Sequence, residues 1–263
     1  MLSRPLYDMM QTLGLRGMAR AFERQLAQAA ITDLCFEERF ALLLDHEQLE
    51  RANYRYAQRL RWAKLPQQNA CIEDIDQRSP RGLDKRVLAQ LTNLSWIEQN
   101  LNVLIVGPTG VGKSYLACAL AHHACKHEIS VRYLRLGRLV EELTKADALR
   151  KKSLLFKQLA KAQLLVIDDF GLTPLADTHQ RDLLELLDDR YDKSATLVTS
   201  QLPIDRWHAY LGDPTLADAI LDRLVHNAHR VVLKGESMRA RRGQDHEPKA
   251  ATKEGNTPQH SID

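Results

Sequence analysis

Hydrophobic and polar positions follow two different patterns along the chain. Over residues 4–64, apolar residues such as Met18 and Phe22 recur at steps of three and four, which is typical of amphipathic helices. This pattern predicts two helices, or one long helix broken near Ile31. From residue 101 onward, short and fully apolar runs alternate with longer helical stretches, and such runs are typical of parallel strands buried on both faces. We therefore expect an α/β core with a five-stranded, mainly parallel sheet, preceded by a small all-α domain.

The elements of the core are predicted from the positions of these runs. Strands are expected at residues 101–106, 130–136, 163–168, 195–200 and 230–234. Helices are expected at residues 85–94, 113–127, 139–162 with a break near Asp147, and 179–191, with further helix up to residue 226.

Proline, glycine and polar residues set the expected domain boundaries. Pro66, Pro80 and Gly82 lie in a polar stretch, which indicates a linker. The last residues of the chain are charged and nearly without large apolar side chains, so they are expected to be disordered. The expected units are residues 1–65 (N-terminal helical domain), 66–84 (linker), 85–237 (α/β domain) and 238–263 (disordered tail).

Composition narrows the class of protein. With 263 residues, 44% of them apolar, the chain is long enough for one good-sized core and a smaller appendage. The formal net charge of +3 is too small to indicate a nucleic-acid partner by itself. Cysteines are few and show no paired spacing, which favours reduced thiols. Because the sequence also shows no signal peptide and no apolar run of bilayer length, we expect a cytoplasmic protein without a membrane partner.

A glycine-rich segment follows the first predicted strand and opens the next helix. It consists of Gly107, Pro108, Thr109, Gly110, Val111, Gly112, Lys113 and Ser114, and fits the pattern G-x-x-x-x-G-K-[ST]. The glycines allow a tight turn whose backbone N–H groups approach phosphate oxygens, and the helix directs its positive dipole end at the same anion. Lys113 would reach the β- and γ-phosphates of ATP, and the Ser114 hydroxyl would ligate Mg²⁺. The segment therefore predicts a nucleotide-binding loop.

Two later strand ends supply candidate partners for this loop. The sequence LLVIDDFG places Asp168 and Asp169 at the end of an apolar strand. Asp168 would hold Mg²⁺, and Asp169 would orient or deprotonate the attacking water. Polar residues at the end of the next strand, including Gln201, are placed to sense the γ-phosphate. The two aspartates could instead cap a helix or form a turn. Gln201 could be an ordinary polar residue of a loop.

These motifs resemble those of the IstB-like transposition helper ATPases of bacterial insertion sequences. That family belongs, with the DnaC helicase loaders, to the initiator group of AAA+ proteins. The resemblance covers residues 1–239, and residues 191–239 are its most diagnostic part. It implies an AAA+ core, Mg²⁺-dependent ATP hydrolysis that is slow and stimulated by assembly or DNA, a ring or spiral of copies on duplex DNA, and a transposase partner in the bacterial cytoplasm.

The same resemblance assigns roles to single residues. The correspondences are Lys113 and Ser114 for Walker A, Asp168 and Asp169 for Walker B, Gln201 for sensor I, Arg223 for the arginine finger and Arg239 for a second sensor. The chain departs from the family pattern at Asp169, where glutamate is usual, and at Gln201, where asparagine is usual. The shorter acid favours slow hydrolysis. A pairing of Arg223 with a neighbouring acid on an exposed helix is the alternative to the finger role.

Two basic stretches are candidates for contact with DNA phosphates. Arg51, Arg55 and Arg59 lie four residues apart and so share one helix face, although a solvated face is an equal alternative. Residues 145–161 contain Lys145, Arg150, Lys151 and Lys152, and lie where initiator-type AAA+ proteins carry an extra helical element. Contacts of this kind bind the backbone, so little sequence specificity and a steep salt dependence are expected.

Other functions fit the sequence less well. A DnaC-like helicase loader would use the same machinery on a different partner, and a small-molecule kinase or an adaptor with a vestigial nucleotide site are further alternatives. Cys118, His122 and Cys125 share a helix face, but zinc needs a fourth ligand, so we expect them in the core.

Overall fold

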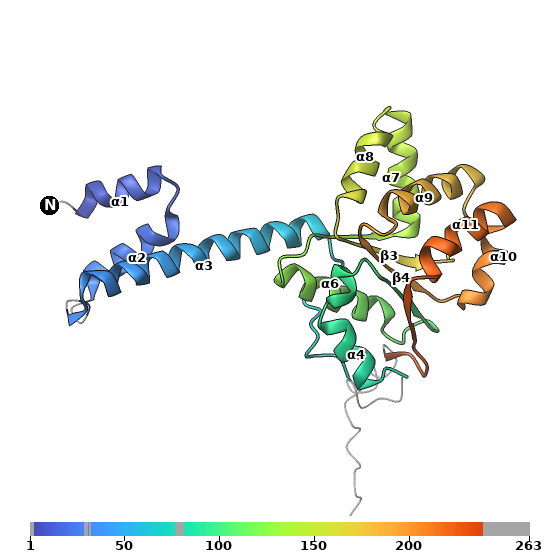
Figure 1. Cartoon of the computed structure of the whole chain (residues 1–263), viewed down its shortest axis with the longest axis horizontal. Coiled ribbons are helices and arrows are strands. Elements are labelled where there is room, and N and C mark those ends of the chain that lie inside the picture. The colour runs from blue at the N-terminus through green and yellow to red at the C-terminus, as the bar shows by residue number, and fades with distance from the viewer. Residues whose placement is uncertain (1–2, 29–30, 32, 77–81, 239–263) are drawn as a thin grey trace, which may run out of the picture.

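The structure is a computed structural model, and it describes residues 3–28, 31, 33–76 and 82–238. Its N-terminal part consists of helices α1 (Ser3–Thr12), α2 (Arg16–Ala27) and α3 (Phe36–Ala63). Figure 1 shows α1 and α2 at the far end of α3, which runs from them to the core. The sequence pattern predicted a single interruption near Ile31, and α2 and α3 are indeed separated there. A second break arises at Gly14, whose φ of 73° ends α1.

The N-terminal helices are held together by the buried carboxylate of Glu47. It accepts hydrogen bonds from the backbone N–H groups of Gly17 (2.7 Å) and Met18 (3.1 Å) at the start of α2, and from Nε of Arg51 (2.7 Å). Burial raises the pKa of Glu47, but these hydrogen bonds outweigh it, and the pKa lies below its ordinary value. A Cβ on Gly17 would lie 2.6 Å from the carbonyl oxygen of His46, so α2 approaches α3 closely only through glycine.

The second half of α3 packs on the core rather than projecting from it. The hydroxyl of Tyr56 lies 2.9 Å from Nε2 of His122, and Nε of Arg59 donates to the carbonyl of Cys125 at 2.9 Å. Both partners belong to α6 (Lys113–Lys126). Segment 64–76 then continues along the core, with Ala70 and Ile75 buried. In its described part, the predicted linker is therefore packed against the α/β domain, because its few apolar residues enter the same core.

The described residues contain one five-stranded sheet in which all neighbouring strands are parallel, in the order β2-β3-β4-β1-β5. Its strands are β1 (Asn102–Val106), β2 (Val131–Arg135), β3 (Leu164–Phe170), β4 (Ala195–Ser200) and β5 (Ala228–Val232). The remaining helices are α4 (Lys85–Thr92), α5 (Ser95–Glu98), α7 (Leu136–Ala148), α8 (Lys152–Ala160), α9 (Asp177–Arg190), α10 (Trp207–Leu211) and α11 (Pro214–Val225), with a 3-10 turn at Ile204–Arg206. The fold class expected from the sequence is confirmed.

Helices cover both faces of the sheet. On β1, Val103 and Ile105 pack in the cluster that contains α4, α5 and α6, whereas Leu104 and Val106 pack with α7 to α11. Because successive side chains of a strand point to opposite faces, a strand between two helical layers must be apolar throughout. This burial explains the continuous apolar runs in the sequence.

The structure also refines two predicted elements. The helical region predicted over residues 139–162 is two helices, and the chain turns between α7 and α8 with Arg150 at a φ of 52°. Strand β5 begins at Ala228, two residues before the predicted start, because it pairs with β1 from its first residue. Among the described residues, no helix is long and apolar enough to cross a membrane.

Candidate nucleotide site

The glycine-rich loop connects β1 to α6, as its sequence predicted. Gly110 and Gly112 have φ angles of 83° and 98°, which residues with a Cβ rarely adopt. The segment after β5 lies across this loop: the N–H of Met238 donates to the carbonyl of Gly110 at 2.9 Å, and a Cβ on Gly110 would lie 2.1 Å from Oγ of Ser237. The turn therefore needs glycine at position 110 for two reasons: its φ angle is positive, and Ser237 leaves no space for a Cβ.

Lys113 is the first residue of α6 and is buried. Its ammonium group donates to the carbonyl oxygens of Gly107 and Pro108, each at 2.8 Å, and so lies at the mouth of the loop. Burial lowers the pKa of Lys113, and the carboxylates of Asp168 and Asp169 oppose this shift. A positive charge backed by a helix N-terminus is suited to bind phosphate oxygens.

The carboxylate of Asp168 is fully buried at the end of β3 and is surrounded by hydroxyl groups. Oγ of Ser114 donates to its Oδ1 at 3.0 Å, Thr199 on β4 donates to the same oxygen, and Tyr133 on β2 donates to Oδ2. Burial, together with the charge of Asp168, raises the pKa of Tyr133, which keeps its hydroxyl a donor. Ser114 and Asp168, the predicted metal residues, are therefore neighbours, and their oxygen atoms are the donor type that Mg²⁺ prefers.

Asp169 adopts the left-handed region with a φ of 61°, at a point where the register between β3 and β4 shifts. Its backbone N–H donates to Oγ1 of Thr199 at 3.2 Å, and its carboxylate lies 3.7 Å from Nε of Arg135 at the end of β2. Left-handed backbone is unfavourable for aspartate outside special turns, and here it accompanies a carboxylate that lines the cavity next to the phosphate loop.

These groups line one cavity of about 430 Å³. Its lining includes Thr109, Gly110, Gly112, Lys113, Ser114, Arg135, Asp169 and Gln201 from the core, and Gln67, Asp74, Ile75 and Asp76 from the segment before it. Gln201 accepts a hydrogen bond from Oγ1 of Thr109 at 2.5 Å. Most of the predicted nucleotide residues, with Asp169 and Gln201, therefore surround a single space. Asp168 lies just beneath it through its bond to Ser114.

Several residues of this site were not singled out from the sequence. Tyr133 was only one aromatic residue of a predicted strand, and Arg135 stood near that strand's end. Thr199 was among the polar residues at the end of β4, but Gln201 was preferred. Both strands also carry other polar side chains, Arg132 and Arg135 on β2 and Thr196 and Ser200 on β4. No signal in the sequence therefore singled out Tyr133 or Thr199.

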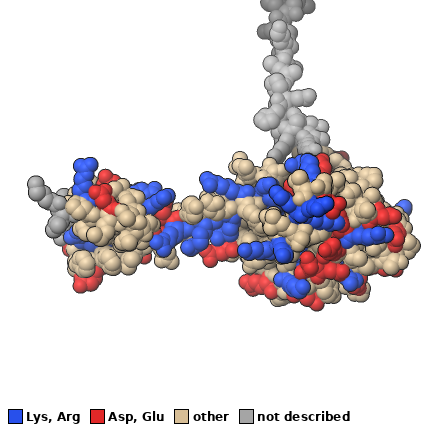
Figure 2. Space-filling view, turned by 90° about the horizontal axis from the view of Figure 1, so that it is seen from above, with Lys and Arg blue, Asp and Glu red and all other residues tan. Residues whose placement is uncertain are grey.

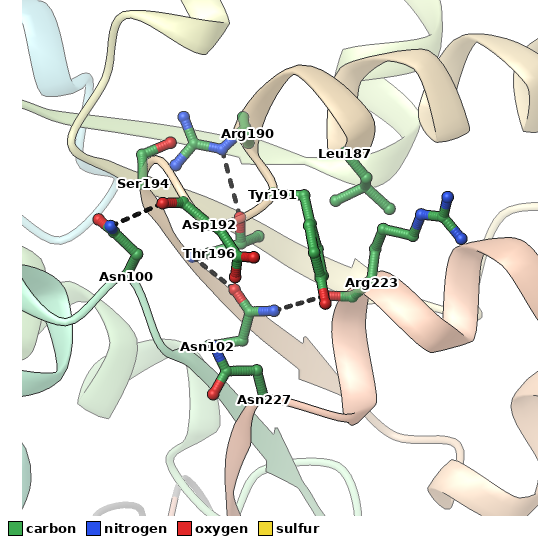
Figure 3. A pocket seen from close by; sticks show the side chains of 10 residues that line it. All are labelled: Asn100, Asn102, Leu187, Arg190, Tyr191, Asp192, Ser194, Thr196, Arg223 and Asn227. Atoms are coloured by element: carbon green, nitrogen blue, oxygen red, sulfur yellow. Dashed lines mark hydrogen bonds between the residues drawn. The ribbon is translucent and has the colours of Figure 1, made fainter.

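Arg223 lies outside this cavity. It is on α11, and its backbone carbonyl accepts a hydrogen bond from the side chain of Asn102, the first residue of β1, whereas the phosphate loop follows the last residue of that strand. Its Nε donates to Asp188 at 2.8 Å and its Nη1 to Asp222 at 3.3 Å. Within one chain, Arg223 and the phosphate loop are therefore at opposite ends of β1. Figure 3 shows Arg223 beside Asn102. Arg239 lies outside the described residues.

Each arginine of the predicted stripe on α3 has a partner within the chain, although the side chains of Arg51 and Arg55 remain about half exposed. Arg51 pairs with Glu47, Arg55 lies 3.7 Å from Glu128, and Arg59 bonds the backbone of α6. Figure 2 shows Lys and Arg side chains along the stretch between the N-terminal helices and the core, with acidic side chains beside them. Arg59 in particular holds α3 on the core, because the C-terminal end of α3 packs against α6.

The second basic stretch is divided between α7, α8 and the turn that joins them. Lys152 is held by Asp182 of α9, and Lys145 lies 3.8 Å from Glu141. Arg150 and Lys151 are exposed in the turn, and the described residues include no acidic partner for either. The α7–α8 turn therefore presents two adjacent exposed positive charges, Arg150 and Lys151.

Comparison with known proteins confirms the resemblance drawn from the motifs. Residues 8–246 match the family described as IstB-like ATP binding protein. The chain is 48% identical over 239 residues to a putative insertion sequence ATP-binding protein of Sinorhizobium fredii, with 91% of this chain and 97% of that protein covered. It is 32% identical over 231 residues to the putative ATP-binding protein of insertion sequence IS21 from Pseudomonas aeruginosa, with 88% and 87% covered.

Solved structures share the fold of the core. A crystal structure of DnaI superposes with a TM-score of 0.55 at 18% identity, covering 63% of this chain and 92% of that one. The crystal structure of the DnaC helicase loader gives a TM-score of 0.52 at 20% identity, covering 63% and 97%. At such identities the likeness concerns the fold alone, which is that of an AAA+ P-loop domain. By its match over residues 8–246 and its relatives, the chain belongs to the family of IstB-like ATP-binding proteins.

Proposed function

We propose that this AAA+ ATP-binding protein assembles on duplex DNA in an ATP-dependent manner and recruits or stimulates a transposase. The observation that supports this most is the cavity where Lys113, Ser114 and Asp169 meet, with Asp168 beneath them, in a chain whose relatives are named as insertion sequence ATP-binding proteins. ATP would set the population of the assembled form, and hydrolysis would release it.

The residues of the cavity would divide the chemistry among themselves. Lys113 and the loop N–H groups would bind the phosphates, and Ser114 and Asp168 would hold Mg²⁺, which neutralises charge on the phosphate oxygens. Asp169 would orient the attacking water and accept its proton. Its side chain is one methylene shorter than glutamate, so the carboxylate reaches less far into the cavity, and slow hydrolysis follows.

Arg223 would act on the nucleotide of a neighbouring copy. Its own chain places it at the sheet end away from the phosphate loop, and its side chain is about one-third exposed, at 32%. An arginine supplied in this way is worth roughly 10³–10⁵ in rate in related phosphoryl-transfer sites. Hydrolysis would then depend on assembly.

Assembly is tested by sizing the protein with and without long duplex DNA, in ATP, ADP and a non-hydrolysable ATP analogue. We expect large assemblies on DNA with ATP or the analogue, and smaller species with ADP. A protein that stays monomeric with saturating ATP and long duplex contradicts the proposal. Capture of the transposase, rather than a replicative helicase, by the ATP-bound assembly separates this function from that of a helicase loader.

DNA contact is proposed at the α7–α8 turn. Replacing Arg150 and Lys151 together by alanine should weaken binding to all duplex sequences alike and reduce the slope of log affinity against log salt by about 1 for each DNA phosphate that is no longer neutralised. The matched control replaces Lys85 and Arg86, an exposed basic pair at the start of α4, and should leave the slope unchanged. Binding by fluorescence anisotropy at several salt concentrations measures both. An unchanged slope in the Arg150 and Lys151 variant places the DNA surface elsewhere.

A further inference from the structure

A buried amide group stands at the end of β1 opposite the phosphate loop. Asn102 is the first residue of the strand, 8% exposed, and the four residues after it are all apolar. Figure 3 shows its side chain between β4 and the last turn of α11. A buried polar group on a central strand needs hydrogen-bond partners, and the identity of those partners shows what it holds.

The carboxamide of Asn102 uses both of its ends. Oδ1 accepts from the backbone N–H of Thr196 on β4 at 3.0 Å. Nδ2 donates to the carbonyl of Arg223 at 2.8 Å and to that of Leu224 at 3.3 Å. The last carbonyls of a helix have no partner within the helix. Asn102 therefore caps the C-terminus of α11 and ties it to the centre of the sheet.

The two ends of Arg223 are thus fixed by different parts of the chain. Its backbone is held by Asn102, and its guanidinium by Asp188 of α9, at 2.8 Å. The helix that carries Asp188 is anchored in turn by Arg190, which is 1% exposed and donates to the carbonyls of Leu159 and Ala162 at 2.8 and 2.7 Å. The side chain of Arg223 therefore extends from a rigid base.

We propose that Asn102 is a positioning residue for Arg223, and that it sets where this arginine is presented to the nucleotide of a neighbouring copy. The inference rests on the proposed function, in which Arg223 acts between subunits. Catalytic groups must be held within a fraction of an ångström of their working position, and a displacement of 1 Å can lower a rate by roughly 10²-fold. Release of the α11 terminus would produce such a displacement without any change in the phosphate loop.

The test compares isosteric substitutions of two asparagines, Asn102 and Asn100, that line the same pocket. Asn102→Asp keeps an acceptor for the N–H of Thr196 but removes the donor to α11. Asn100→Asp removes a comparable amide donor, from Asn100 Nδ2 to the carbonyl of Asp192 at 2.9 Å, without touching α11. We expect Asn102→Asp to lower DNA-stimulated ATP turnover by roughly 10- to 100-fold with unchanged ATP affinity, and Asn100→Asp to leave turnover as it is. Asn102→Ala, which adds no charge beside the carbonyls, should behave like Asn102→Asp.

Mixing subunits separates positioning from a general folding defect. Asp169→Asn subunits keep the phosphate loop and supply an intact Arg223 and Asn102, but they lack the carboxylate proposed to accept the proton of the water, so they should restore turnover to Asn102→Asp subunits. Arg223→Ala subunits should not restore it, and Asn102→Asp should add no further loss within an Arg223→Ala chain. Restoration by Arg223→Ala subunits would mean that Asn102 serves its own chain's nucleotide site, and would overturn the inference.

Different results would contradict the finger role of Arg223 and the positioning role of Asn102. Full turnover in Arg223→Ala assemblies on DNA would remove the finger role and the inference with it. Loss of turnover in Arg223→Ala together with normal turnover in Asn102→Asp and Asn102→Ala would remove only the positioning role of Asn102.

Discussion

Replacing Lys113 by alanine is expected to abolish ATP turnover and, with it, ATP-dependent assembly on DNA. The ammonium of Lys113 lies at the mouth of the phosphate loop, held by two loop carbonyls at 2.8 Å. Bound nucleotide would exchange these carbonyls for phosphate oxygens. Hydrogen bonds to charged groups contribute about 1.5–3 kcal/mol each, so losing two of them lowers ATP affinity roughly 100-fold or more.

Binding of a fluorescent ATP analogue and release of phosphate measure this prediction. Lys126→Ala is the matched control, because Lys126 is an exposed lysine at the other end of the same helix. It should keep normal affinity and turnover, and thermal melting of both variants checks their fold. Turnover that persists in Lys113→Ala would mean that this loop does not carry the ATPase activity.

Arg223→Ala is expected to keep ATP affinity and lose the part of turnover that depends on assembly. The loss should be about 10³-fold or more, because Arg223 would contribute charge to a neighbour's transition state rather than to its own nucleotide. An ion pair on the surface, the alternative role with Asp188 and Asp222, contributes only about 0–1 kcal/mol to stability and would leave turnover unchanged.

Single-turnover hydrolysis on long duplex DNA measures the effect. Arg20→Ala is the control, since Arg20 is also in a surface ion pair, with Glu50, but on the N-terminal helices far from the sheet. Mixing Arg223→Ala with Asp169→Asn subunits, which keep the phosphate loop and an intact Arg223, should recover turnover at the composite sites. Failure of this mixture, when each variant folds and assembles, would contradict action between subunits.

The sequence by itself determined the elements of the core and the chemistry of the phosphate loop. The turn between β1 and α6 depends on glycines and a helix start that are neighbours in the chain, so its spacing is visible in the sequence. The apolar runs within β1 (residues 103–106) and β3 (residues 164–167) likewise follow from the burial of both faces of these strands between two helical layers. The family resemblance rested on the same local patterns.

The tertiary structure decided which distant residues meet around those elements. Tyr133 and Thr199 reach Asp168 only because β2, β3 and β4 are neighbours in the sheet, and Ser237 covers Gly110 only because β5 lies beside β1. The tertiary structure also places Arg59 in the contact between α3 and α6, and it brings Asn102 into hydrogen-bond contact with Arg223, 121 positions away in the chain. Such contacts depend on strand order and helix docking, which hydrophobic periodicity does not specify, because periodicity records that a side chain is buried and not what it is buried against.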